Sequence, residues 1–127
     1  MKTLGVLLLT LVGLVAVQAV QADTATVGPL VGVWEGTLQT NDGSYRARLN
    51  ITKDESGVIN ITVDSLDQNN MGIPTANVSL KGSTFHFELP SLEGVYEGTV
   101  DDMKTLIKGV WVQRSNDGLP LDFKKVK

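Results

Sequence analysis

A seven-residue segment occurs twice in this chain and constrains the fold more than any other feature. Residues 32–38 are GVWEGTL and residues 94–100 are GVYEGTV, and residues 108–113 (KGVWVQ) form a weaker, reversed copy. In a β-strand, residues two apart lie on the same face, so each copy places an aromatic side chain and a glycine side by side. A glycine there leaves room for a ring from the next strand. The repeat therefore predicts a β-protein and, by itself, no chemistry.

Apolar and polar residues alternate through most of the remaining chain, as in residues 45–52 (YRARLNIT) and 84–89 (TFHFEL). Alternation is typical of strands with one face in a core and one in water. Short turn sequences such as residues 41–43 (NDG) separate the alternating segments and indicate hairpins. No amphipathic helix is predicted. We expect eight strands, near residues 32–39, 45–52, 58–64, 75–81, 84–89, 93–100, 105–113 and 119–126.

Eight antiparallel strands in sequence order predict an all-β, up-and-down meander. A strongly curved sheet or a small lipocalin-like barrel would bury its single apolar face. The domain would span residues 30–127, preceded by a flexible leader at 23–29, where no periodicity is present. Trp34, Tyr96 and Trp111 would then belong to the inner face, as core residues or as part of a ligand site.

The first 22 residues have the order typical of a secretory signal peptide. Lys2 precedes an apolar run at residues 4–17, and Val20-Gln21-Ala22 forms a small-residue cleavage site. A membrane anchor is the alternative, but the run is shorter than the roughly 20 residues that a spanning helix needs. We therefore expect a protein of the bacterial periplasm or a secreted protein, with no stable membrane insertion after cleavage.

The composition narrows the classes of partner. The formal net charge is −3 and no basic run is present, which argues against nucleic acid and anionic membranes as partners. The chain has no cysteine, so it has neither disulfides nor thiol chemistry. Small secreted eukaryotic domains often carry disulfides, and their absence favours a bacterial envelope protein.

The chain has one histidine, His86, between Phe85 and Phe87. Because the two phenylalanines take the core-facing positions, we expect His86 to face solvent. A hydrolytic centre would have to combine His86 with Ser83 or Asp64, and no nucleophile-elbow motif is present. We expect no catalytic residues.

Metal and cofactor sites are equally poorly supported. With one histidine and no cysteine, the chain lacks most of the side chains that usually bind zinc. Asp64, Asp67, Asn69 and Asn70 lack the spacing of a calcium loop, and Glu35 and Glu97 point outward rather than forming a buried carboxylate pair. We expect no metal and no cofactor.

One connection is longer than a hairpin turn, residues 65–74 (SLDQNNMGIP). Long connections in compact β-domains are often functional or cover one end of a barrel. The candidate ligand-binding residues are therefore three from this loop and the three aromatic residues of the repeat: Asp67, Gln68, Asn69, Trp34, Tyr96 and Trp111.

Seven short motifs resemble the small β-domain that precedes the catalytic domain in some secreted bacterial α/β-hydrolases of the serine aminopeptidase-like and dienelactone hydrolase-like type. The most specific are residues 64–68 (DSLDQ) and 72–74 (GIP). The others are Gly32-x-Trp34-x-Gly36, Leu49-x-Ile51, Leu92-x-Gly94-x-Tyr96-x-Gly98, Ile107-x-Gly109-x-Trp111-x-Gln113 and Leu119-Pro120-Leu121. The resemblance implies a free-standing accessory domain. The nucleophile, oxyanion hole and histidine of the family would lie beyond Lys127, so no catalytic residue is carried over.

Three interpretations follow. The first is a non-catalytic accessory or binding module for a small apolar or peptidic ligand, or for a partner protein of the envelope. The second is a structural or protein-interaction domain, which a large exposed apolar patch would favour. The third is an enzyme, including a fragment of a longer secreted serine hydrolase.

Overall fold

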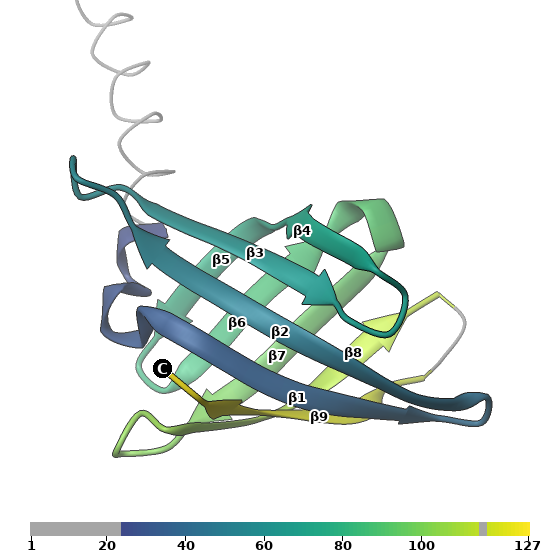
Figure 1. The fold of residues 1–127 in the computed structure, drawn as a ribbon. Helices are drawn as coiled ribbons and strands as arrows, with labels where there is room; N and C mark the ends of the chain where they lie inside the picture. The colour runs from purple at the N-terminus through teal and green to yellow at the C-terminus, as the bar shows by residue number, and fades with distance from the viewer. Residues whose placement is uncertain (1–23, 115–116) are drawn as a thin grey trace, which may run out of the picture.

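A single sheet of nine antiparallel strands makes up the protein in a computed structural model that describes residues 24–114 and 117–127 (Figure 1). The predicted signal peptide lies outside the described residues. The strands are β1 (Gly32–Thr40), β2 (Gly43–Lys53), β3 (Ile59–Ser65), β4 (Asn70–Pro74), β5 (Ala76–Lys81), β6 (Thr84–Leu89), β7 (Gly94–Val100), β8 (Leu106–Gln113) and β9 (Leu119–Lys125). Two 3₁₀ turns accompany them, η1 (Gly28–Leu30) and η2 (Pro90–Leu92).

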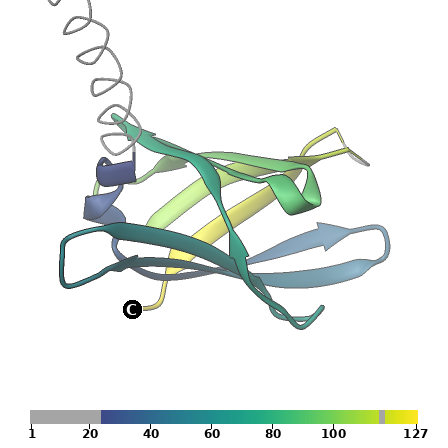
Figure 2. The same cartoon turned by 90° about the horizontal axis from the view of Figure 1, so that it is seen from above.

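The sheet curves into a nearly closed barrel. Its strand order is β4-β3-β2-β1-β9-β8-β7-β6-β5, so the first and last strands pair at its centre, with Trp34 opposite Lys125. The seam lies between β4 and β5. Seen from above, the β1–β3 layer and the β6–β8 layer lie on opposite sides of the core and their strands cross (Figure 2). The predicted all-β, up-and-down, barrel-like fold is confirmed.

The number of strands differs from the prediction, nine instead of eight. The additional strand, β4, lies within the segment predicted as a loop and pairs with β3, with Ile73 opposite Val63. Only residues 66–69 remain as a turn. The sequence of β4 does not alternate in the way that predicts a strand. It is an edge strand with one buried side chain, Ile73, and its Met71 is exposed. The chain passes from β4 to β5 through Thr75 alone, which donates a hydrogen bond to the carbonyl of Ile61 (2.8 Å).

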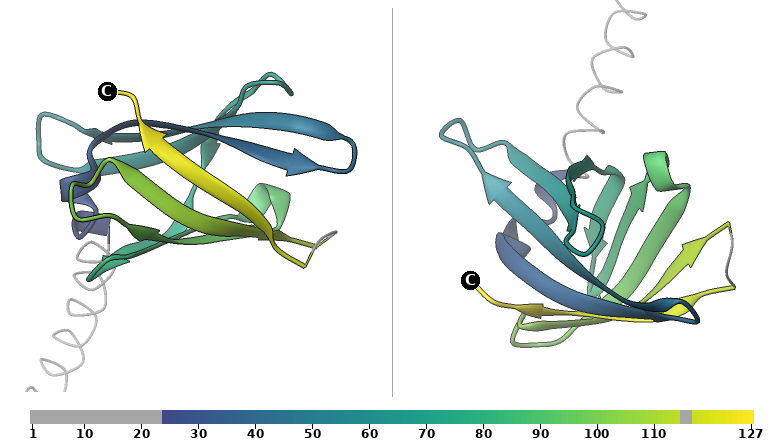
Figure 3. Two further views of the ribbon diagram at one scale, coloured as in Figure 1. Left: turned by 90° about the horizontal axis from the view of Figure 1, so that it is seen from below. Right: turned by 45° about the vertical axis from the view of Figure 1, so that its right-hand side comes forward.

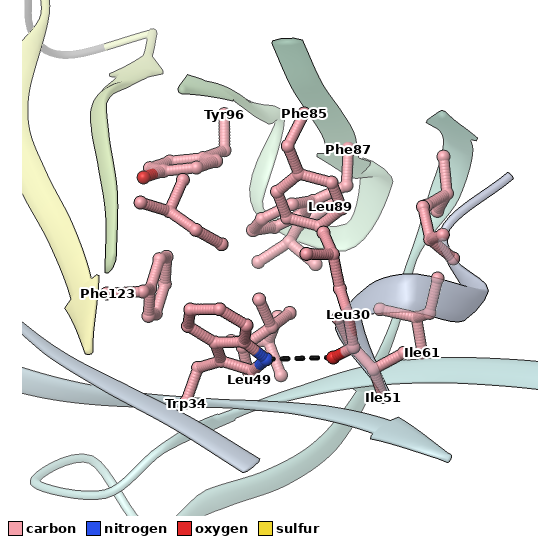
Figure 4. Close-up of a cluster of buried hydrophobic side chains, with 14 of the residues drawn as sticks. Leu30, Trp34, Leu49, Ile51, Ile61, Phe85, Phe87, Leu89, Tyr96 and Phe123 are labelled. Carbon is pink, nitrogen blue, oxygen red and sulfur yellow. Dashed lines mark hydrogen bonds between the residues drawn. The ribbon is translucent and has the colours of Figure 1, made fainter. Parts of the chain in front are cut away.

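The described part of the predicted flexible leader is packed against the barrel, which corrects that prediction. Val27 and Leu30 are fully buried. The indole Nε1 of Trp34 donates to the Leu30 carbonyl oxygen (2.9 Å, Figure 4), and the backbone N–H of Leu80 donates to Thr26 Oγ1 (3.0 Å). Residues 24–30 therefore close one end of the barrel, because Val27 and Leu30 are buried in the core although they do not belong to a strand.

The repeated glycines and aromatic residues pack as the repeat predicts. Tyr96 lies opposite Trp111 in the β7–β8 ladder, and Gly98 lies opposite Gly109. A methyl group added to Gly109 would collide with the Tyr96 ring, and one added to Gly94 with the Trp111 ring. The Tyr96 hydroxyl donates to the Leu121 carbonyl oxygen (2.8 Å), and burial raises the pKa of this phenol. The glycines are thus needed to seat the two rings on the inner face.

Candidate functional site

A cavity of about 710 Å³ opens at the end of the barrel opposite η1. It is lined by the last residues of β1 and the first of β2, whereas η1 precedes the start of β1. The left view of Figure 3 shows η1 at one end of the molecule and the β1–β2 hairpin at the other. Ligand cavities in proteins commonly fall between about 300 and 1,000 Å³, so this space suits one small molecule.

The inner wall of the cavity is apolar and comes from both layers of the barrel. Because each strand places alternate residues inward, side chains from β2, β3 and β4 face side chains from β6, β8 and β9. The apolar wall consists of Leu38, Tyr45, Ala47, Val63, Ile73, Phe87, Leu89, Leu92, Trp111, Leu119, Leu121 and Phe123.

The mouth of the cavity is polar and rich in uncharged groups. Ser65 Oγ donates to Gln68 Oε1 (2.7 Å), and Ser44 Oγ donates to Gln39 Oε1 (2.7 Å). In the hydrogen bonds of the described residues, the Nε2 groups of Gln39 and Gln68 have no acceptor. Both glutamines line the cavity. A ligand at the mouth therefore meets two amides that can still hydrogen-bond.

An ion pair lies on the outer face of the sheet, near this mouth. Arg46 lies between the inward-facing residues Tyr45 and Ala47, so its side chain points outward and is 63% exposed. Its Nη2 lies 2.8 Å from Asp67 Oδ1, while its Nε lies within 3.3 Å of both carboxylate oxygens. The backbone N–H of Arg46 also donates to Asp67 Oδ2 (2.7 Å). These hydrogen bonds lower the pKa of Asp67 and raise that of Arg46. The guanidinium of Arg46 is therefore paired within the chain, on the outer face of the barrel.

A chain of hydrogen bonds ties η2 to β8 beside the cavity. Trp111 Nε1 donates to Gln113 Oε1 (3.1 Å), and Gln113 Nε2 donates to the Leu92 carbonyl oxygen (3.0 Å). An ion pair between Arg114 and Glu93 adds a second link, and neither of these residues lines the cavity. The position of Leu92 on the wall is thus held from β8.

The six residues predicted for a ligand site divide into three groups. Trp111 and Gln68 line the cavity. Asp67 does not line it but binds the neighbouring Arg46. Trp34 and Tyr96 are fully buried and are not among the lining residues. Asn69 is exposed in the turn before β4, with a left-handed backbone (φ 53°).

The sequence also missed most of the wall, including Phe87, Leu89 and Phe123. Alternation marks these side chains as inward-facing, but it cannot distinguish an inner face that meets other side chains from one that meets empty space. The glutamine at the mouth from β1, Gln39, carried no signal beyond its place near a turn.

The alternation of residues 59–64 (INITVD) predicts that Asp64 faces water, and the structure corrects this prediction. Asp64 is buried, and its carboxylate accepts hydrogen bonds from Asn50 Nδ2 (3.0 Å) and from the backbone N–H of Gly72 (2.8 Å). Asp64 does point away from the core, but the edge strand β4 covers it. Its role in the fold is to hold β4 against β3.

His86 lies on the outer face of β6, as predicted, but it is only partly exposed. Its Nδ1 lies 3.3 Å from Glu97 Oε2 and its Nε2 lies 3.0 Å from Glu88 Oε2. Hydrogen bonds from Asn77 and His86 lower the pKa of Glu88. Neither Ser83 nor Asp64 is a partner of this imidazole. Both ring nitrogens therefore face carboxylates, an arrangement that leaves none to activate a serine.

The two glutamates of the repeat are also on the surface, as predicted, and bind separate partners. Glu35 Oε2 pairs with Arg48 (3.2 Å) on the β1–β2 face, and Glu97 pairs with His86 on the β6–β7 face. Within residues 24–114 and 117–127, no group of three or more histidine, aspartate or glutamate side chains is arranged to hold a metal ion.

Comparisons with protein-family models and with curated proteins gave no match for this chain. None of the helices in the described part of the chain has the length and apolar character that crossing a membrane requires.

Proposed function

We propose that this chain is a non-catalytic binding module that takes one small apolar ligand into the open end of its barrel. The observation that carries this proposal is the cavity of about 710 Å³, which combines an apolar wall with a polar mouth. Small barrels of about eight strands either fill their interior with side chains or hold one small ligand. Here the interior is filled at the end closed by residues 24–30 and hollow at the other, so a ligand would enter from one side.

A role in binding rather than catalysis is supported by the groups around the cavity. The ionisable residues among those that line it are Asp42, Tyr45 and Arg46, and the side chain of Arg46 is turned outward and paired with Asp67. The single histidine lies on the outer face, between two glutamates. General acid–base or nucleophilic catalysis commonly relies on a histidine or another activating base beside the bound molecule, and His86 is not a lining residue.

We also propose that the module acts in the bacterial envelope, periplasmic or secreted, as an accessory of other proteins. This rests on the signal-peptide pattern and on the resemblance to domains that precede α/β-hydrolases. The most specific segment of that resemblance, residues 64–68, lies at the mouth of the cavity, where Ser65 and Gln68 are lining residues. The segment that carries the resemblance thus coincides with the proposed site.

The alternative, a protein-interaction domain, is favoured by one observation. Val95 and Val112 are cross-strand partners on the outer face of β7 and β8, and with Val110 they are 38 to 45% exposed. If this face binds a partner protein, Val112→Lys would abolish that association, measured by analytical ultracentrifugation, and leave ligand binding unchanged. An association that Val112→Lys leaves unchanged would contradict an interface on this face.

Filling the cavity tests the main proposal. Ala47 lines the cavity, so Ala47→Phe should abolish saturable binding of 1-decanol, followed by the fluorescence of Trp111. Ala76 is also a half-buried strand alanine but is not a lining residue, which makes Ala76→Phe the matched control. The proposal fails if the wild-type protein gives no saturable change, or if both substitutions reduce binding equally.

A further inference from the structure

Two polar residues, Tyr45 and Ser65, lie on the inner face at the β2–β3 side of the cavity. Tyr45 is the cross-strand partner of Leu38, and Ser65 is the partner of Ala47. Partners in an antiparallel ladder share a face of the sheet. Leu38 and Ala47 pack against the core, so Tyr45 and Ser65 also point inward. They are diagonal neighbours across the strands, a separation that long side chains can span.

Gln68 adds an amide on the same side, from the turn before β4. Its Oε1 accepts the hydrogen bond from Ser65 Oγ, which keeps the amide beside the inner face. This bond leaves the Nε2 group of Gln68, which can only donate. The Tyr45 hydroxyl likewise has no partner in the hydrogen bonds of the described residues. Two donors are therefore available to a ligand at this side of the cavity.

The other polar groups that line the cavity from inward-facing strand positions are already bound within the chain. Thr40 Oγ1 donates to the Gly43 carbonyl oxygen (2.9 Å). Trp111 Nε1 donates to Gln113 Oε1, and Gln113 Nε2 donates to the Leu92 carbonyl oxygen. No buried side-chain nitrogen or oxygen of the described residues lacks a partner. The remaining wall therefore suits the apolar part of a ligand.

The inner face also lacks a cation. Arg46 is the only basic residue that lines the cavity in the described part of the chain, and its side chain points outward to Asp67. Gln39 likewise alternates with inward-facing residues and binds Ser44 on the outer face. Carboxylates and phosphates are commonly bound by arginine or lysine. A neutral polar group fits the inner face better than an anionic one.

We propose that the ligand is an apolar molecule with one neutral oxygen acceptor, such as the carbonyl of a ketone or an ester, and that Tyr45 and Gln68 select it by donating hydrogen bonds to this oxygen. A carbonyl oxygen has two lone pairs and can accept from both donors. This inference rests on the proposed function, since it names the ligand class of the same cavity.

The experiment compares 2-octanone with 1-octene, which has the same number of carbon atoms and no oxygen. Headspace gas chromatography above the protein solution measures the free concentration of each ligand. Comparing the ratio of the two dissociation constants between variants cancels the cost of removing each ligand from water. Tyr45→Phe keeps the ring and removes the hydroxyl, and Gln68→Leu removes the amide. Each should weaken 2-octanone binding about fivefold relative to 1-octene, as expected for one lost hydrogen bond.

Thr40→Val is the matched control, because it removes a hydroxyl that lines the cavity but already donates to Gly43. It should leave the ratio unchanged, and circular dichroism should show that all variants are folded. An unaltered ratio in Tyr45→Phe and Gln68→Leu, or an equal fall in Thr40→Val, overturns the inference while the proposed function stands. Absence of saturable binding of both ligands by the wild-type protein overturns the proposed function itself.

Discussion

The two ends of this barrel are built from the same strands but finish differently. At the closed end, Val27, Leu30 and Trp34 are fully buried, and an aromatic cluster fills the space behind them (Figure 4). At the open end, equally apolar strand residues surround a cavity of about 710 Å³. The difference arises from what covers each end. An apolar chain segment covers one, and polar turns surround the other, so the same strand pattern gives packing in one place and a binding space in the other.

The largest expected effect is at the closed end, with a substitution that removes its central ring. Trp34→Ala should lower the free energy of unfolding by about 4 kcal/mol, because it leaves a cavity and removes the partner of the Leu30 carbonyl. Trp111→Ala should cost about 2 kcal/mol, since that ring already borders empty space. Urea unfolding followed by circular dichroism measures both. Equal costs would mean that the two ends are packed alike.

A smaller effect is expected when one methyl group is added beside a ring in the packed core or beside a ring at the cavity. Gly109→Ala should destabilise by about 2 kcal/mol, because the Tyr96 ring it meets is enclosed by Phe85, Phe87 and Phe123. Gly94→Ala meets the Trp111 ring, which can move toward the cavity, so we expect about 1 kcal/mol.

Thermal unfolding by calorimetry is the measurement for this pair. Gly28→Ala, where an added methyl group meets nothing within 4 Å, serves as the control and should be nearly neutral. A larger cost for Gly94→Ala than for Gly109→Ala would contradict the difference in packing.

The smallest effect is a pH dependence that both ends share. Backbone hydrogen bonds from Thr105 and Leu106 lower the pKa of Asp101 in the β7–β8 turn below its ordinary value of 3.8, and Arg46 lowers that of Asp67 at the open end. A carboxyl group with a lowered pKa stabilises the fold above its unfolded pKa. That stabilisation is lost as the pH falls below about 4 through the folded value.

Melting temperatures of the wild type, Asp101→Asn and Asp67→Asn between neutral pH and pH about 3 check this expectation. Each variant should have a lower melting temperature than the wild type at neutral pH and lose less on acidification. A variant that follows the wild-type curve at all pH values would show that its carboxylate contributes nothing.

Much of the fold could be predicted because period-2 alternation reports directly which face of a strand is buried. It identified the inward positions of residues 45–52 and 84–89, and the glycine–aromatic pairs predicted the contact of Gly109 with Tyr96. It failed where burial does not depend on that period. The edge strand β4 shows a single buried residue, Asp64 is buried on the outer face by this strand, and Val27 and Leu30 precede the first strand.

The candidate site could be predicted only in part for a related reason. Asp67, Gln68 and Asn69 are consecutive, but a tight turn sends their side chains to different places. Gln68 lines the cavity, Asp67 binds Arg46, and Asn69 is exposed. Arg46 lies 21 residues away along the chain, and nothing local in the sequence links it to Asp67. The aromatic residues of the repeat were separated in the same way, with Trp111 at the cavity and the other two fully buried in the packed core.

By itself, the sequence determined a β-protein with paired glycines and aromatic residues, its hairpins and the identity of its core-facing side chains. These depend on local period and turn chemistry, which neighbouring residues carry. Only the tertiary structure decided that β1 and β9 join, that residues 24–30 close one end, and that the other end is left hollow. Those outcomes depend on which distant segments meet, and contacts between distant segments are set by packing of the whole chain.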